Sequence, residues 1–382
     1  LLFMIAAESD LADFVTAIST HLADLAKEYG YKGRLEVIPN GVDLEKFKVK
    51  SLKFKVKDGD SKIIITTSRL VYKNGIDILI KAVAEVKKQI PDVQCWIVGD
   101  GPEKESLKFK VKSLKLEDNI KFFGEIPHEE IPKYLHQADV FVRPSRSEGM
   151  GNSFVEALAA GLPIIGTPVG GITDIIKDNQ TGLFARNGDF NDLAEKIKLL
   201  LADKELGQTI VQNGQRLVKE RFSWEKIVKV YELFFSELNK KYLRIVIATG
   251  LFHPDIGGPA TYSKMLSDRL PEYGFLVKIV SFGAVRKLPK VVRHLVYFFK
   301  VCRKAWGSDI IFAQDPVSVG LPAMLVAKIL RKKFLLKVVG DYAWEQFQQG
   351  SRVKEIENRF ITPDDFQEEK LDFVTELRRK TE

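Results

Sequence analysis

The chain has 382 residues, which is long for one domain and usual for two. Apolar residues make up 45% and charged residues 29%, and this balance excludes an intrinsically disordered protein. The net charge of +8 permits anionic partners, but the sequence carries no aromatic-basic signature of an RNA- or DNA-binding module, so we expect no nucleic-acid partner.

The sequence predicts a cytoplasmic protein. No apolar run reaches the ~20 residues that span a bilayer, and the apolar stretch 1–7 lacks the basic leader and cleavage site of a signal peptide. Cys95 and Cys302 lie in apolar patterns, which predicts buried thiols. The sequence contains no CxxC pair, so neither a zinc site nor a redox motif is expected, and a reducing compartment suits the chain.

Short β-branched runs alternate with amphipathic helical patterns along the chain. This alternation predicts an α/β protein with parallel sheets covered by helices on both faces. Strands are expected at 13–19, 34–38, 62–67, 94–98, 120–123, 140–142 and 163–166, with helices such as 76–89 and 129–137 between them. A helix at 224–238 then precedes a second series of strands at 242–249, 277–281, 309–313 and 334–339.

The string FKVKSLK occurs twice, at 47–53 and at 109–115. Its alternation of Lys with apolar residues has the period of a strand, although the second copy falls where a helix suits its surroundings. We attach no function to it.

The most informative stretch is PSRSEGMGNSFVEALAAG, at 144–161. A strand is expected to end near Arg143, a glycine-bearing loop to follow, and a helix to begin near Ser153. The free amides at such a helix start attract phosphate. Two carboxylates bracket the site, Glu148 in the loop and Glu156 in the first turn.

Each of these carboxylates has a structural alternative. Ser153-x-x-Glu156 has the form of a capping box, in which the Glu side chain bonds back to the helix start. Glu148 can equally be a solvated loop acid.

Two further glycine loops follow expected strands, TPVGGI at 167–172 and GDGP at 99–102. Each alone is typical of a turn, but three at consecutive strand ends indicate a ligand across the carboxyl edge of a sheet. None is a GxGxxG or P-loop motif, which disfavours NAD enzymes and P-loop NTPases. Arg69 and Lys73, near the end of the strand 62–67, could neutralise a diphosphate or be solvated surface charges.

Together these features resemble the retaining glycosyltransferases of family 4, which have the GT-B fold. The resemblance covers nearly the whole chain and is most specific in EGMGNSFVE, where Glu148 and Glu156 form the family's E-x7-E pattern. Supporting motifs are IPNGVD, SRLVYKNG, VGDGP, FFGEIP and TPVGGI. The resemblance implies two Rossmann-like parallel-sheet domains that face a cleft.

The resemblance also implies roles for particular residues. Arg69 and Lys73 would hold the donor pyrophosphate, Glu156 would bind the ribose and Glu148 the transferred sugar. Other donor-binding positions would be Gly149, Met150, Gly151, Asn152, Gly170 and Gly171, with Glu125 and Ile126 near the base, and Gly257 and Gly258 near the phosphates. The family's His-containing turn corresponds to 339–342, which has no His, so Asp341 is the acceptor-side catalytic candidate.

The reaction implied is transfer of a hexose from a nucleotide diphosphate sugar, expected to be a UDP-sugar, to an acceptor hydroxyl with retention of configuration. Fixed cations would make a metal unnecessary, and we expect no cofactor. The alternatives are an epimerase or phosphorylase of similar fold, and a non-catalytic or engineered scaffold that binds nucleotide sugar.

The two halves appear in the reverse of the family's order, which predicts a circular permutation. We expect a donor domain at 44–223, an acceptor domain made of 1–43 plus 242–382, and a crossover helix and linker at 224–241. Two independent consecutive domains are the alternative. The basic, apolar segment 290–306 could lie on an anionic membrane that carries a lipid-linked acceptor, or be a buried helix.

Overall fold

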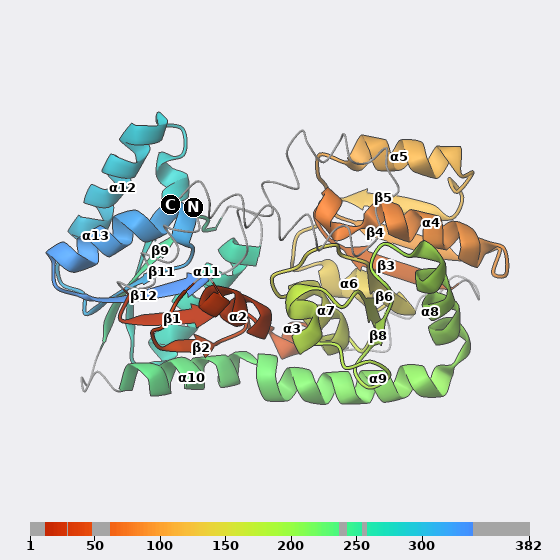
Figure 1. Cartoon of the computed structure of the whole chain (residues 1–382), viewed down its shortest axis with the longest axis horizontal. Helices are drawn as coiled ribbons and strands as arrows, with labels where there is room; N and C mark the ends of the chain where they lie inside the picture. The colour runs from red at the N-terminus through yellow and green to blue at the C-terminus, as the bar shows by residue number, and fades with distance from the viewer. Residues whose placement is uncertain (1–11, 29, 48–61, 237–242, 254–257, 339–382) are drawn as a thin grey trace. The chain divides into compact units, whose positions relative to one another are not determined.

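The computed structural model describes residues 12–28, 30–47, 62–236, 243–253 and 258–338 (Figure 1). These residues form two compact units, which divide after Gly41 and after Ser223. Unit 1 holds the described residues of 12–41 and 224–338, and unit 2 holds those of 42–223.

Unit 2 is built on a parallel sheet with the strand order β5-β4-β3-β6-β7-β8. Its strands are β3 (Ile63–Thr67), β4 (Gln94–Val98), β5 (Ile120–Gly124), β6 (Val140–Arg143), β7 (Ile164–Gly166) and β8 (Leu183–Phe184). Its helices are α3 (Leu44–Phe47), α4 (Ile76–Lys87), α5 (Lys104–Ser113), α6 (Ile131–Leu135), α7 (Asn152–Ala159), α8 (Phe190–Ala202) and α9 (Lys204–Leu217). The strand order reverses direction between β3 and β6.

The strands of unit 2 are apolar on both faces because helices cover both. Side chains such as Ile64 and Cys95 pack in one core with residues of α4, α5 and α8. On the other face, Phe141 meets Phe154 of α7 edge-on, with ring centroids 5.2 Å apart. This explains why β3 reads as a continuous apolar run in the sequence.

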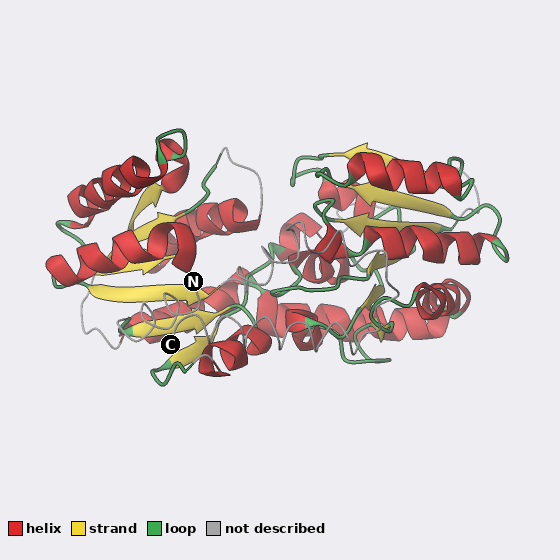
Figure 2. Cartoon of the chain, turned by 45° about the horizontal axis from the view of Figure 1, so that its top comes forward, coloured by secondary structure: helices red, strands yellow, loops and turns green. Residues whose placement is uncertain are grey.

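Unit 1 has a second parallel sheet with the order β10-β9-β11-β12-β1-β2. Its strands are β1 (Phe14–Ala17), β2 (Leu35–Val37), β9 (Arg244–Thr249), β10 (Leu276–Ser281), β11 (Ile310–Ala313) and β12 (Lys333–Val338). Its helices are α2 (Thr20–Glu28), α10 (Trp224–Ser236), α11 (Gly258–Arg269), α12 (Lys290–Ala305) and α13 (Leu321–Ile329). Helices α10 and α11 pack on one face, and α12 and α13 on the other (Figure 2).

Short 3-10 or π-helical turns join several of these elements. They are η2 (Tyr72–Asn74), η3 (Gly170–Asp174), η4 (Val218–Phe222), η5 (Leu270–Tyr273), η6 (Phe282–Val285) and η7 (Pro316–Gly320).

The strand positions expected from the sequence agree with the structure to within a few residues, and among the strands that the structure describes only the two-residue strand β8 was not expected. The second FKVKSLK copy lies mainly in α5, where Leu107 and Val111 are buried one helical turn apart. Its strand-like alternation is therefore overridden by its surroundings. Apart from Phe47, the first copy lies outside the described residues.

The first strands of the chain belong to the same sheet as its last described strands. Strand β1 pairs in parallel with β12, so the first strands of the sequence complete the sheet that contains β9. Two independent consecutive domains are therefore not what this chain forms. The helix α10 packs within unit 1. The circular permutation itself stays a prediction.

The two cysteines differ in burial. Cys95 is fully buried, and this burial raises its pKa to about 12, whereas Cys302 at the side of α12 is only half-buried.

Helix α12 is buried on one side only. It buries Tyr297 and Val301 and leaves Phe299 exposed, so the expectation of a buried helix holds for that one side. Within the described ranges, no helix has the length and hydropathy needed to cross a membrane.

A buried lysine stands at the end of β12. Lys337 is 1% exposed, and its Nζ lies 2.8 Å from Asn40 Oδ1 and 3.1 Å from the centroid of the Tyr262 ring. Burial lowers the pKa of Lys337 well below its ordinary value, because the interior solvates the ammonium group poorly.

This burial should make the stability of unit 1 depend on pH. Between the lowered pKa of folded Lys337 and its unfolded pKa near ~10.4, the unfolded chain binds the extra proton, so stability rises with pH by up to about 1.4 kcal/mol per unit. Lys337→Met should abolish this rise and raise the melting temperature near neutral pH. The exposed Lys278→Met is the matched control. Equal pH dependence in wild type and Lys337→Met, measured by thermal unfolding, would contradict this account.

Candidate functional site

All strands of unit 2 run parallel, so the loops that follow them meet at one edge of the sheet. The sheet order reverses between β3 and β6, and in open α/β sheets such a switch point opens a crevice where ligands bind. The loops after β3 and β6 carry Arg69, Lys73 and Glu148. The fold therefore brings these three residues to the place where a ligand is expected.

A glycine allows the two switch-point loops to touch. Gly75 has φ +68°, and a Cβ atom there would lie 1.9 Å from the carbonyl oxygen of Pro144. The Arg146 amide also donates to the carbonyl oxygen of Lys73 at 2.7 Å. The turn η2, which carries Lys73, is thus held directly against the loop that carries Glu148.

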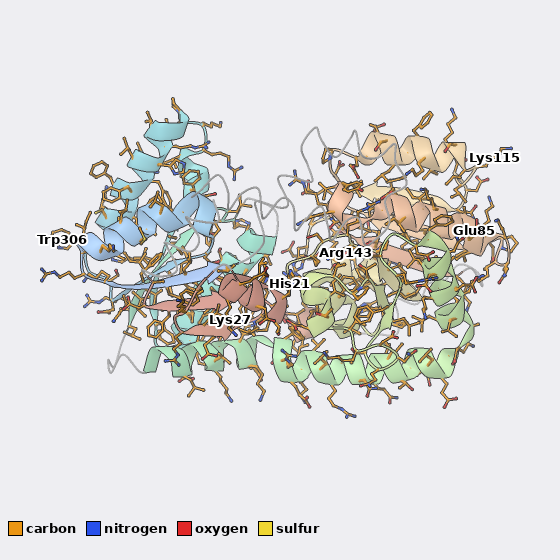
Figure 3. All side chains as sticks on the ribbon, in the orientation of Figure 1. His21, Lys27, Glu85, Lys115, Arg143 and Trp306 are labelled. Carbon is orange, nitrogen blue, oxygen red and sulfur yellow. The ribbon has the colours of Figure 1, made fainter. Side chains whose placement is uncertain are left out.

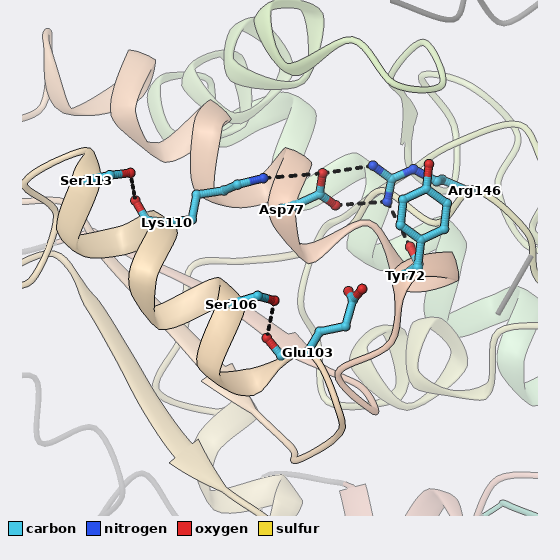
Figure 4. Close-up of polar contacts among 7 residues, drawn as sticks. All are labelled: Tyr72, Asp77, Glu103, Ser106, Lys110, Ser113 and Arg146. Carbon is cyan, nitrogen blue, oxygen red and sulfur yellow. Dashed lines mark hydrogen bonds and ion pairs between the residues drawn. The ribbon is translucent and has the colours of Figure 1, made fainter. Parts of the chain in front are cut away.

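A buried ion pair locks the same contact. Both terminal guanidinium nitrogens of Arg146 donate to the Asp77 carboxylate at 2.8 Å, and Nη1 also donates to the carbonyl oxygen of Tyr72 at 2.8 Å (Figure 4). The guanidinium carbon lies 3.9 Å from the centroid of the Tyr72 ring, and Lys110 approaches Asp77 at 3.8 Å. Burial by itself would raise the pKa of Asp77, but the hydrogen bonds and charge of Arg146 outweigh it and lower that pKa.

Glu148 is held by a second arginine, which sequence reasoning missed. Arg143, the last residue of β6, pairs with Glu148 and donates to Ser153 Oγ at 2.8 Å. The side chains of Arg143 and Glu148 are 8% and 16% exposed. The interpretation of Glu148 as a solvated loop acid is therefore wrong.

The TPVGGI loop closes on the same acid. Gly170 has φ +53°, and a Cβ atom there would lie 1.8 Å from the carbonyl oxygen of Glu148. The Gly171 amide donates to that oxygen at 3.1 Å. A glycine at 170 is needed because the two backbones approach so closely.

Helix α7 begins at Asn152 with Gly151 as its N-cap, at φ +92°. Gly151 has no side chain to occupy the first amides of the helix, which suits an anion-binding start. The capping-box interpretation of Ser153 and Glu156 is wrong, because the helix begins before Ser153 and both side chains bond elsewhere. Glu156 Oε1 lies 2.8 Å from His128 Nε2.

His128 belongs to a polar chain that was also missed. Lys46 Nζ lies 2.7 Å from His128 Nδ1, so Lys46, His128 and Glu156 form one line of contacts. Burial lowers the pKa of Lys46, although nearby carboxylates, including Glu156, oppose that shift. The available signal was the His that follows the FFGEIP motif.

The third glycine loop packs against the first switch-point loop. A Cβ atom at Gly99 would lie 1.9 Å from the carbonyl oxygen of Ser68, and one at Gly101 would lie 2.3 Å from that of Leu70. The Gly99 amide donates to the carbonyl oxygen of Gly124 at 2.7 Å, which joins the end of β5 to the same network. The loops after five neighbouring strands thus form one connected rim.

Comparison with known proteins agrees with this arrangement. Residues 48–217 match the family model described as "Glycosyl transferases group 1". This matched region resembles the group 1 glycosyl transferases and makes up less than half of the chain. The unit 2 contacts described above lie within residues 48–217 or in the few residues before them.

Curated relatives match this region and its flanks over part of their own length. The GDP-mannose-dependent alpha-(1-6)-phosphatidylinositol monomannoside mannosyltransferase of Mycolicibacterium smegmatis is 30% identical over 226 residues, which are 56% of this chain and 59% of that protein. The N-acetyl-alpha-D-glucosaminyl L-malate synthase of Bacillus anthracis is 31% identical over 232 residues, which are 59% of this chain and 60% of that protein. The chain therefore matches about three fifths of the length of these curated relatives.

Solved structures support the fold. HepE of Anabaena, in complex with UDP and glucose, superposes with a TM-score of 0.55 and 26% identity, over 59% of this chain and 64% of HepE. Sucrose-phosphate synthase of Thermosynechococcus elongatus gives a TM-score of 0.55 and 30% identity, over 60% and 59% of the two chains. With the two parallel-sheet units, these neighbours confirm the expected GT-B fold.

The remaining site residues fall into two groups. Within residues 48–217, Arg69 and Glu125 are exposed, Lys73 and Ile126 are half-buried, and Met150 is buried. Gly257 and Asp341 lie outside the described residues, and Gly258 begins α11 in unit 1. The structure thus brings the unit 2 residues to one sheet edge.

The Asp77–Arg146 pair should contribute strongly to the stability of unit 2. Arg146→Ala leaves Asp77 without its main partner in a largely buried place, so the free energy of unfolding should fall by about 3 kcal/mol. Lys108→Ala, which breaks an exposed pair with Glu105, should cost at most about 0.5 kcal/mol. Denaturant unfolding measures both, and a similar small loss in the two variants would contradict the assignment.

Proposed function

We propose that the protein is a retaining glycosyltransferase that moves a hexose from a UDP-sugar to an acceptor hydroxyl without a metal ion. The observation that carries the proposal is the convergence of Lys73, Glu148 and the start of α7 at the β3–β6 switch point. Support for the donor base comes from HepE, which was solved with UDP. The mannosyltransferase relative is named as GDP-mannose-dependent, so both nucleotides belong in the test.

The proposed chemistry is electrostatic. When the sugar leaves, negative charge builds on the diphosphate, and Arg69 and Lys73 together with the amides from Gly149 to Asn152 stabilise that charge. Because these cations are part of the chain, the reaction needs no divalent metal. The backbone around Gly170 and Gly171, which the Gly171 amide ties to the Glu148 carbonyl oxygen, forms the other wall of this anion site.

Glu148 and Glu156 bind different parts of the donor. Glu148, held by Arg143, faces the transferred sugar, and Glu156 accepts hydrogen bonds from the ribose hydroxyls. His128 holds the Glu156 carboxylate in place, which reduces the entropy lost on binding. The backbone around Glu125 and Ile126 meets the base.

On the acceptor side, Gly257 and Gly258 let the backbone approach the donor phosphates, and Asp341 acts at the acceptor hydroxyl. The name of the Mycolicibacterium smegmatis relative includes a phosphatidylinositol monomannoside, which supports a lipid-linked acceptor. We also propose that the chain is cytoplasmic and circularly permuted, with unit 2 as the donor domain and unit 1 as the acceptor domain.

A donor screen tests this function. At 100 times its dissociation constant, the correct nucleotide diphosphate sugar should stabilise the fold by roughly 2.7 kcal/mol, and transfer to an added acceptor should follow. Arg69→Ala and Lys73→Ala should weaken donor binding and slow transfer. Glu148→Gln should reduce turnover more than nucleotide affinity, and Glu156→Gln should do the reverse.

The controls separate the alternatives. Binding without transfer to any acceptor favours a non-catalytic scaffold, and conversion of the donor without an acceptor favours an epimerase. If Glu156→Gln lowers the melting temperature and leaves donor affinity intact, Glu156 has a structural role and the ribose assignment is wrong.

A further inference from the structure

Helix α12 in unit 1 has an apolar stripe that faces solvent. Its buried side presents Tyr297, Val301 and Ala305 to the sheet. On another side of the helix, Val292, Leu295 and Phe299 follow at spacings of three and four residues, with exposures of 44%, 56% and 67%, and Trp306, just past the helix end, is 78% exposed. This is the spacing of a continuous helical stripe.

The neighbouring helix α13 carries a second exposed stripe. It packs beside α12 on the same face of the sheet, and both helices contribute to one core (Figures 1 and 2). Leu321, Leu325 and Ile329 are 38%, 41% and 64% exposed on the side opposite that core. Figure 3 shows Trp306 at the outer margin of this unit. The outer layer of unit 1 therefore exposes apolar stripes on two adjacent helices, and contiguous apolar surface of this kind marks interaction sites.

Charge identifies the occupant of this surface. Residues 286–308 contain seven Lys or Arg and no Asp or Glu, and residues 316–332 contain three and none. On α12, the exposed Arg303 borders the apolar stripe, and Lys300 and Lys304 follow beyond it. A surface with apolar side chains and a one-sign basic border matches the boundary of an anionic bilayer, where acyl chains meet negative headgroups.

A second copy of the chain fits this surface poorly. A two-fold interface places the same patch against itself, so the basic border of one copy would meet the basic border of the other. Nucleic acid would satisfy the charges and leave both apolar stripes in water. An anionic lipid surface satisfies both features at once.

We propose that the outer faces of α12 and α13 form a docking surface for an anionic lipid bilayer. Leu295, Phe299 and Trp306 enter the headgroup–acyl boundary, and the neighbouring Lys and Arg side chains pair with lipid phosphates. The helices lie in the plane of the interface. The proposal stands on unit 1 alone and does not depend on the reaction assigned to unit 2.

Co-sedimentation of the full chain with vesicles tests the proposal. The chain should bind vesicles of phosphatidylcholine with roughly 30% phosphatidylglycerol at low salt, and should not bind pure phosphatidylcholine. The double variant Leu295→Glu, Phe299→Glu should reduce the partition coefficient at least about tenfold, because it places two carboxylates in the boundary. Replacement of Lys300, Arg303 and Lys304 by Gln should reduce it about fivefold per charge.

Phe109→Glu is the matched control, because Phe109 on α5 of unit 2 is 75% exposed and lies outside the proposed surface. It should bind vesicles as the wild type does, and both Glu variants should keep their melting temperatures because the changed side chains are exposed. Equal binding by wild type and the Leu295→Glu, Phe299→Glu variant would overturn the proposal. So would absence of wild-type binding with a dimer that these two substitutions dissociate in sedimentation analysis.

Discussion

The pair between Asp77 and Arg146 is the constraint on which the unit 2 site depends. Asp77 stands in the first turn of α4, after β3, and Arg146 stands in the loop after β6. Their contact spans the switch point of the sheet, and it fixes Lys73 relative to Glu148 through the Arg146 amide. Because the pair is largely buried, water screens it little, and it holds the two loops against each other.

Glycines extend that constraint along the sheet edge. At Gly75, Gly99 and Gly170, a Cβ atom would lie within 2 Å of a neighbouring carbonyl oxygen, so each loop touches the next through backbone alone. Hydrogen bonds from the amides of Gly99, Arg146 and Gly171 to carbonyl oxygens of neighbouring loops strengthen these contacts. The site is therefore a rim of backbone with a few charged side chains set into it, an arrangement suited to a phosphate-bearing ligand.

Much of the fold could be predicted from the sequence, because parallel strands that are buried on both faces consist of continuous β-branched runs such as that of β3. The pairings within the site could not. Ser153 and Glu156 have the spacing of a capping box, but Gly151 already starts the helix, and Glu156 bonds to His128, which comes 28 positions earlier. Arg143 and Arg146 were missed because only tertiary contacts give them partners.

Hydrogen–deuterium exchange with UDP and GDP, at saturation verified by calorimetry, tests the central claim most directly. The amides at the start of α7 and in the loop after β3 should exchange more slowly when the nucleotide binds, because its phosphates occupy them. Protection should therefore appear in peptides covering 68–75 and 144–156 and spare α5 and α9. Calorimetric binding with unchanged exchange in both segments would contradict a nucleotide site at the switch point between β3 and β6.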